Sequence, residues 1–179
     1  TFLPSESAAL EFVKKVRGMA TRPVALEFFS CQALEMLRRQ KATNPAFKEI
    51  PDMPAAWHTA VYVEYQGESE APVEAAVTAM TEIMVECGGD ADAAWLAADV
   101  REMERLKYFR HAVPEAVNLT IDQRRKKEPG LTKLGTDLAV PDARLDDVMA
   151  MYHAGLDGAG LEYVIFGHIG NNHVHVNIL

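Results

Sequence analysis

Two segments near the end of the chain, residues 161–168 and 173–179, restrict the fold more than any other feature of the sequence. Both have the pattern of a β-strand, and in the second of them polar and apolar residues alternate, as in a strand with one buried face. Asn171-Asn172 lies between them and suits a tight turn, because asparagine tolerates positive φ. We therefore expect the two strands to pair antiparallel as a hairpin.

The rest of the chain mixes helical and strand patterns. Apolar residues at helical spacing predict five helices, at residues 5–18, 30–40, 70–87, 92–112 and 142–155. Three further strands are predicted at residues 24–29, 57–66 and 132–140. Pro114 is expected to limit the fourth helix, since proline lacks the backbone N–H. We therefore expect a single α+β domain over residues 1–179, with an antiparallel or mixed sheet of about five strands and helices packed on one face, as in ferredoxin-like folds.

The composition narrows the classes of function. With 179 residues, of which 49% are hydrophobic and 25% charged, the chain is long enough for one domain with its own core. Its net charge of -8 argues against a nucleic-acid partner, because phosphate binding needs a basic surface. No apolar run approaches the roughly 20 residues of a membrane span. Cys31 and Cys87 are expected to be reduced thiols in a cytoplasmic protein.

Three of the six histidines lie in the predicted hairpin. With Asn171-Asn172 as a two-residue turn, three pairs of residues face each other across it: Gly170 with His173, His168 with His175, and Phe166 with Asn177. Directly opposed residues have Cβ atoms about 4.5–5.5 Å apart, so two opposed imidazoles can bind one cation through bonds of about 2.0–2.1 Å. Exposed or hydrogen-bonded histidines without a metal remain the alternative. The spacing identifies no third or fourth ligand.

The stretch from Gly167 to Asn177 resembles a known motif. Its sequence, GHIGNNHVHVN, is similar to the G-H-[IV]-G-D-G-N-[LV]-H-x-N motif in the C-terminal substrate, or cap, domain of FAD-linked oxidases. These are the D-lactate, glycolate and D-2-hydroxyglutarate dehydrogenases, with a flavin domain of the vanillyl-alcohol oxidase type. Weaker similarities at residues 24–28, 108–115 and 133–141 extend the resemblance over most of the chain. The resemblance implies oxidation of a 2-hydroxy acid to the 2-oxo acid, with hydride transfer to FAD.

Matched residue by residue, the resemblance implies several site residues. His168 and His175 correspond to two metal ligands, usually for zinc or manganese. Asn177 corresponds to a substrate contact near the metal, and Arg110 to an arginine that pairs with a substrate carboxylate, a role that suits the bidentate guanidinium. An ion pair on the helix surface is the alternative for Arg110. His173 replaces the asparagine of the motif, so it binds the metal, binds the substrate or does neither.

Lys133 is a further candidate for substrate binding. Some members of the family carry a substrate-binding lysine two residues before the aspartate of the strand at 132–140. That position is Gly135 here, and Lys133 lies two residues further back, on the same face of the strand.

The resemblance also implies parts that lie outside residues 1–179. The third metal ligand of the family is a glutamate in a Glu-His motif that follows the hairpin, and the histidine of that motif is often assigned as the catalytic base. The FAD-binding domain precedes the substrate domain. We therefore expect a truncated substrate domain without dehydrogenase activity of its own, with FAD bound by the absent domain and a divalent metal that the fragment does not necessarily retain.

The expected partners follow from the same resemblance. They are a small 2-hydroxy acid, the FAD domain of the parent chain and an iron–sulfur or other electron-transfer partner, with a homodimer left open. The parent is expected in the cytoplasm or peripherally at the inner membrane. Two alternatives remain. One is a free-standing α+β module that binds a small molecule or mediates assembly, with incidental histidines. The other is a compact metallohydrolase that uses His168, His173 and His175.

Overall fold

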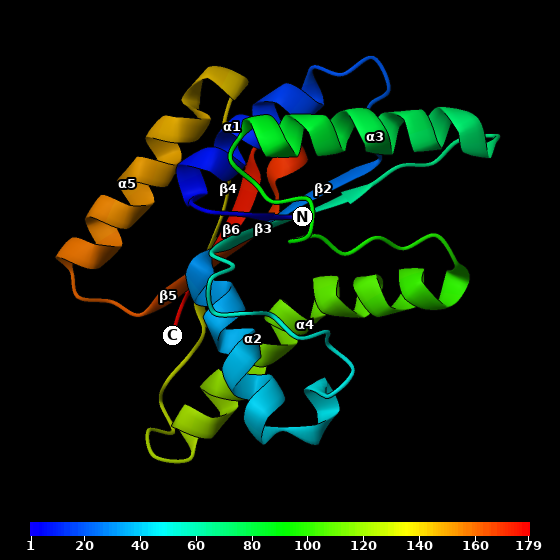
Figure 1. Ribbon diagram of the computed structural model, residues 1–179. Coiled ribbons are helices and arrows are strands. Elements are labelled where there is room, and N and C mark those ends of the chain that lie inside the picture. The colour runs from blue at the N-terminus through cyan, green and yellow to red at the C-terminus, as the bar shows by residue number, and fades with distance from the viewer.

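The computed structural model describes residues 1–179 as a six-stranded sheet packed against five α-helices (Figure 1). The strands follow the order β1-β3-β2-β5-β6-β4, and every neighbouring pair is antiparallel. Their bounds are β1 Phe2–Leu3, β2 Ala25–Phe29, β3 Thr59–Glu64, β4 Leu134–Ala139, β5 Tyr163–His168 and β6 His173–Ile178. The expected α+β class is confirmed, and a short first strand adds to the strands that the pattern predicted.

Helices cover both faces of the sheet. Their bounds are α1 Glu6–Arg17, α2 Cys31–Thr43, α3 Glu70–Glu86, α4 Val100–Arg125 and α5 Leu145–Gly158. Helices α1, α3 and α5 pack on one face, and α2 and α4 on the other (Figure 1). We expected helices on one face only. The central strand β2 explains the difference, because Phe28 is buried on the side of α1 and Phe29 on the side of α4, so both faces need a cover.

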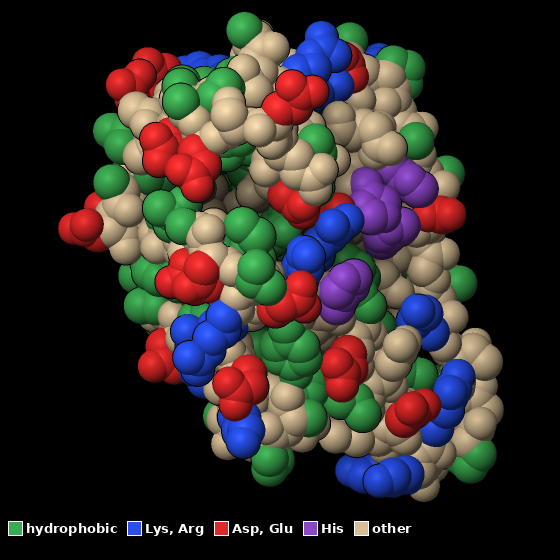
Figure 2. Space-filling model, turned by 90° about the vertical axis from the view of Figure 1, so that its right-hand side faces the viewer, with side chains coloured by type: hydrophobic (Ala, Val, Ile, Leu, Met, Phe, Trp, Pro, Cys, Tyr) green, Lys and Arg blue, Asp and Glu red, His purple; other side chains and the backbone are tan.

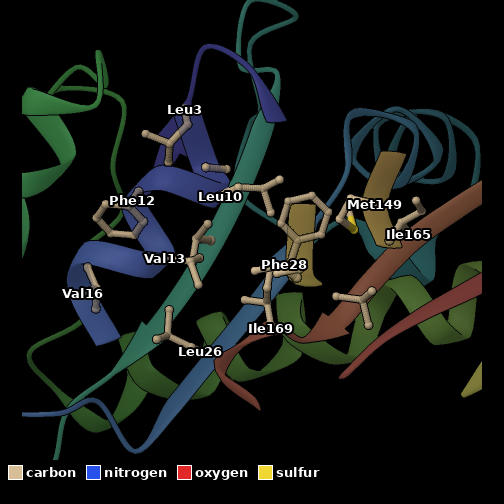
Figure 3. Close-up of a cluster of buried hydrophobic side chains, with 14 of the residues drawn as sticks. Leu3, Leu10, Phe12, Val13, Val16, Leu26, Phe28, Met149, Ile165 and Ile169 are labelled. Carbon is tan, nitrogen blue, oxygen red and sulfur yellow. The ribbon is translucent and has the colours of Figure 1, made fainter. Parts of the chain in front are cut away.

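The larger of the two core clusters lies between the sheet and helices α1 and α5 (Figure 3). It joins the buried faces of these helices to strands β2, β3, β5 and β6, through side chains that include Phe12, Val13, Phe28, Met149 and Ile165. Phe12 and Phe28 are fully buried, so truncation of either to alanine is expected to cost about 3–5 kcal/mol. This cluster fixes β5 and β6 in place, and with them the hairpin that carries the histidines.

Helix α4 departs from its expected boundaries. It is capped by Asp99, runs to Arg125 and contains Pro114 in its interior, so the end predicted two residues before the proline was wrong. Pro114 leaves the carbonyl of Arg110 without its helical partner. The helix continues because its buried side, which includes Val117, packs against α2. No helix of the structure, α4 included, combines the length and the apolar character that crossing a membrane requires.

The β5–β6 hairpin has a longer turn than expected. Residues 169–171 form a turn of 3-10 helix, and Asn172 follows in the left-handed region with a φ of 58°. His168 therefore pairs with His173. The predicted register, with His168 opposite His175, was wrong by two residues. A shift of two residues preserves the side of the sheet on which each side chain lies, so the three histidines still share one face.

Candidate functional site

His168, His173 and His175 form a cluster on the sheet face that α2 and α4 cover. Their ring centroids lie 5.0 Å apart for His173 and His175, 5.3 Å for His168 and His175, and 6.0 Å for His168 and His173. The side chains of His173 and His175 are 26% and 27% exposed, and that of His168 is 49% exposed. Figure 2 shows histidine side chains side by side at the surface, with basic and acidic side chains nearby. The cluster is therefore accessible to a ligand.

Gly167 makes room for this cluster. Its φ of +118° lies in a region that L-residues rarely adopt. A Cβ atom at this position would lie 2.5 Å from Cδ2 of His175 and 3.3 Å from its Nε2. Glycine therefore allows the ring of His175 to lie against the backbone of β5, next to His168.

Glu27 of β2 joins the cluster to Arg110 of α4. Glu27 is only 4% exposed, and one of its carboxylate oxygens accepts hydrogen bonds from Arg110 and from Nδ1 of His168, the latter at 2.8 Å. An ionised carboxylate can only accept, so Nδ1 of His168 carries a proton and Nε2 of the neutral ring is free for a ligand. Cζ of Arg110 also lies 5.7 Å from the ring centroid of Tyr62. Arg110 therefore pairs with a buried carboxylate. The alternative considered from the sequence was an ion pair on the helix surface.

Asp137 of β4 faces the other two histidines. Its Oδ1 lies 2.6 Å from Nε2 of His173 and 3.1 Å from Nδ1 of His175. The hydrogen bond from His173 holds the pKa of Asp137 below its ordinary value. Burial lowers the pKa of His175, and the neighbouring histidines add to this shift. At neutral pH both shifts favour the forms that bind a cation, an ionised carboxylate and a neutral imidazole.

The turn that carries the histidines is tied to the rest of the fold. The buried side chain of Asn172 donates to the carbonyl of Val140 at 3.1 Å and to Asp142 at 2.6 Å. It also accepts a hydrogen bond of 2.6 Å from Arg17, which pairs with Asp142 as well. Hydrogen bonds from Arg17 and then from Asn172 lower the pKa of Asp142. The network holds the β5–β6 turn and the segment before α5 against α1.

An open cleft of about 710 Å³ adjoins the cluster. His168 contributes to its wall, and the charged residues along it are Lys14, Arg17, Glu27, Arg22, Arg110 and Asp142. Basic side chains therefore outnumber carboxylates in this cleft. A small anion, such as the carboxylate of an organic acid, is the kind of ligand that such a cleft favours.

The other two candidates from the sequence lie further along the same strands. Asn177 is buried on the histidine face, two residues beyond His175. Lys133 precedes β4, and its Nζ lies 3.5 Å from Oδ1 of Asn118. Since a strand rises about 3.3 Å per residue, Lys133 is roughly 13 Å from Asp137 along the strand. The structure brings Arg110 and the three histidines together, but it leaves Lys133 apart from them.

Sequence reasoning gave no role to Glu27 or Asp137, although these carboxylates contact all three histidines. A signal existed for Glu27, because a glutamate within the apolar stretch ALEFF is a charge that folding buries, and buried charges need partners. Asp137 was noticed only as part of a strand that resembles the family. The pairing of β4 with β6 was needed to place it opposite His175.

The spacing of the rings fits a shared cation. For metal–nitrogen bonds of about 2.0–2.1 Å at a tetrahedral angle, the centroids of two imidazole ligands lie roughly 5 Å apart. The separation of 5.3 Å between His168 and His175 agrees with this value.

A comparison of the sequence with protein families matches residues 1–179 to the family described as FAD linked oxidases, C-terminal domain.

Proposed function

Since this chain belongs to the C-terminal domain family of the FAD-linked oxidases, we propose that it is the substrate-binding domain of a flavin-dependent dehydrogenase that oxidises a 2-hydroxy acid, of the D-lactate or glycolate type. The family makes the enzyme an oxidoreductase and implies FAD as its cofactor. One observation carries the proposal. Glu27 joins His168 to Arg110 at a basic cleft, so a group suited to a cation and a group suited to a carboxylate lie side by side.

Arg110 is proposed to bind the carboxylate of the substrate. Glu27 engages one of its terminal nitrogens, and the guanidinium keeps further N–H donors for a second carboxylate. Glu27 offsets the charge of Arg110 and Asp142 offsets that of Arg17, so Arg22 supplies the basic charge of the cleft that no ion pair offsets. A hydroxy acid bound in this way directs its carboxylate to Arg110 and its hydroxyl group to the histidines.

His168 and His175 are the residues that would hold a divalent cation, zinc or manganese, beside the hydroxyl group. When bound, such a cation lowers the pKa of that hydroxyl. Glu27 keeps the proton of His168 on Nδ1, and Gly167 keeps the ring of His175 beside it. These residues and Arg110 together would fix the orientation of the C–H bond that is broken.

The redox chemistry belongs to FAD, and the domain supplies position and electrostatics. We assign no FAD contact to residues 1–179, in which no glycine-rich pyrophosphate-binding loop occurs. The FAD-binding domain of the parent chain is the proposed partner. Asn177 on the histidine face remains a proposed substrate contact, because it lies one strand repeat beyond His175.

Ligand-observed NMR on the purified chain in the presence of Zn²⁺ or Mn²⁺ tests this proposal. We expect D-lactate, glycolate or D-2-hydroxyglutarate to bind more tightly than propionate, acetate or glutarate, the matched acids without the hydroxyl group. Arg110→Met should weaken binding of the hydroxy acid about tenfold or more, because a hydrogen bond to a charged group is lost. Arg39→Met, on the exposed side of α2, is the control. Equal binding of hydroxy and deoxy acids would contradict the proposal.

A metallohydrolase is the second candidate, and Asp137 is the observation that favours it. A carboxylate beside His173 and His175 can act on a metal-bound water. Hydrolysis of p-nitrophenyl acetate or p-nitrophenyl phosphate by the zinc-loaded chain, lost in His175→Gln, would support this candidate over the oxidoreductase.

A further inference from the structure

The pairing of β4 with β6 places a carboxylate against two imidazoles. Asp137 pairs with His175, and Ala139 pairs with His173, so Asp137 and both histidines lie on one face of adjacent strands. Directly opposed Cβ atoms are about 4.5–5.5 Å apart, and diagonal neighbours about 7–8 Å. Backbone hydrogen bonds between the strands fix this arrangement, which does not depend on a loop.

The side chains of these three residues converge. One ligand atom of each lies within 4.8 Å of the ligand atoms of the other two. Oδ1 of Asp137 is 2.6 Å from His173 and 3.1 Å from His175. Ring protons make these contacts in the absence of a metal, and a cation replaces such protons when it binds. Asp137 is 76% exposed, so the group is open to solvent on the side of the carboxylate.

We propose that Asp137, His173 and His175 are three ligands of a divalent-cation site that lies entirely within this chain. Two imidazoles and one carboxylate suit Zn²⁺, Mn²⁺ or Fe²⁺, whereas Mg²⁺ and Ca²⁺ prefer oxygen ligands alone. This site deepens the proposed function and rests on it, because both place a cation at this hairpin. The resemblance implies His168 and His175 as ligands, whereas the site proposed here combines His175 with Asp137 and His173.

His168 lies beside this site, toward the cleft. Its ring centroid is 5.3 Å from that of His175 and 6.0 Å from that of His173. The hydrogen bond to Glu27 leaves its Nε2 free, but His168 stands outside the group whose ligand atoms lie within 4.8 Å of one another, so it would have to turn its ring to become a fourth ligand. With His168 bound in this way, the cation would face the cleft that Arg110 lines, and the hydroxyl group of a substrate would reach it from there.

Zinc affinity measured by competition with a chromophoric chelator tests the ligand set. His173→Gln and Asp137→Asn are each expected to weaken Zn²⁺ binding at least about tenfold, the loss that even a supporting partner of a ligand causes. His175→Gln should have at least the same effect. His58→Gln and Asp122→Asn change exposed residues outside the cluster and should bind Zn²⁺ as the wild type does. Circular dichroism verifies that each variant is folded.

The outcomes separate this site from the proposed function. Unchanged Zn²⁺ affinity in both His173→Gln and Asp137→Asn overturns the site. If His168→Gln and His175→Gln then lose the cation, the proposed function stands with that pair of ligands. Failure of the wild type to bind Zn²⁺, Mn²⁺ or Fe²⁺ also overturns the site.

Failure of the proposed function alone can also be distinguished from failure of the cation site. If His173→Gln and Asp137→Asn lose Zn²⁺, the site holds. If, with the site intact in the wild type, hydroxy acids bind no better than the matched deoxy acids, the proposed function fails while the cation site remains.

Discussion

Nδ1 of His168 lies 2.8 Å from a carboxylate oxygen of Glu27. The same oxygen accepts a hydrogen bond from Arg110, so one buried group contacts both a candidate cation ligand and a candidate anchor for a substrate carboxylate. This contact fixes which nitrogen of His168 carries the proton. It also couples the two halves of the site, because any ligand that draws Arg110 toward itself changes the charge balance around Glu27.

Glu27→Gln should lower the free energy of unfolding by about 1.5–3 kcal/mol, because Arg110 and His168 lose a buried, charged hydrogen-bond acceptor. Zn²⁺ affinity should fall about 10–100-fold, since a neutral amide holds the proton of His168 on Nδ1 less strongly than a carboxylate does. Urea unfolding and chelator competition measure the two effects. Glu35→Gln, an exposed carboxylate on α2, is the control and should change stability by less than about 0.5 kcal/mol. Equal results for the two variants would contradict the role of Glu27.

Gly167→Ala should destabilise the fold by about 1–3 kcal/mol, because its φ of +118° strains any other residue. The added Cβ would also press on the ring of His175, so Zn²⁺ binding should weaken. Gly155→Ala is the matched control. Nothing lies within 4 Å of a Cβ at this helical position, so the change should stabilise α5 by about 0.5–1 kcal/mol. Thermal unfolding of both variants, with and without Zn²⁺, checks this prediction.

The fold could be predicted from the sequence where local pattern and burial agree. The periodicity of residues 70–87 predicted α3 almost to its ends, Glu70–Glu86. The differences come from tertiary contacts. Pro114 is tolerated inside α4 because the helix packs against α2, and β1, with the two residues Phe2–Leu3, is too short to show any periodicity.

At the site, the sequence predicted that the three histidines share a face, but it did not predict their pairing. The 3-10 turn at residues 169–171 is not evident from Asn171-Asn172, so the register was displaced by two residues. Glu27 reaches His168 because β2 pairs with β5, which follows it by more than a hundred residues in the chain. Local periodicity carries no information on such long-range pairing, so this partner could not be predicted.

Asn172 should contribute to stability through both its side chain and its backbone. Asn172→Gly keeps a residue that accepts a φ of 58° but removes the hydrogen bonds to Val140, Asp142 and Arg17, and should cost about 1–3 kcal/mol. Asn172→Ala should cost about a further 1 kcal/mol, because alanine is strained in the left-handed region. Chemical unfolding of both variants measures the difference. An alanine variant as stable as the glycine variant would contradict the backbone contribution.

The ion pair of Arg17 with Asp142 should make stability depend on pH. The pKa of Asp142 is lowered in the folded protein, so its contribution is present above the ordinary carboxyl value near 3.8 and is lost as the pH falls through the folded pKa. The wild type should therefore be more stable than Asp142→Asn at pH 6, and the gap should narrow at pH 3 and below. Urea midpoints at the two pH values test this. A gap that is constant or widens toward low pH would contradict the assignment.

The central claim is that His168 and Arg110 position a 2-hydroxy acid for oxidation by a flavin. Its most direct test is anaerobic bleaching of the flavin in an enzyme that joins this domain to its FAD-binding domain, with D-lactate, glycolate and D-2-hydroxyglutarate as substrates. We predict that at least one of them bleaches the wild-type flavin, and that His168→Gln and Arg110→Met each slow bleaching at least about a hundredfold, as expected when several kcal/mol of stabilisation are lost. Arg39→Met should bleach at the wild-type rate. Bleaching by none of the three acids, or at unchanged rates in His168→Gln and Arg110→Met, would contradict the claim.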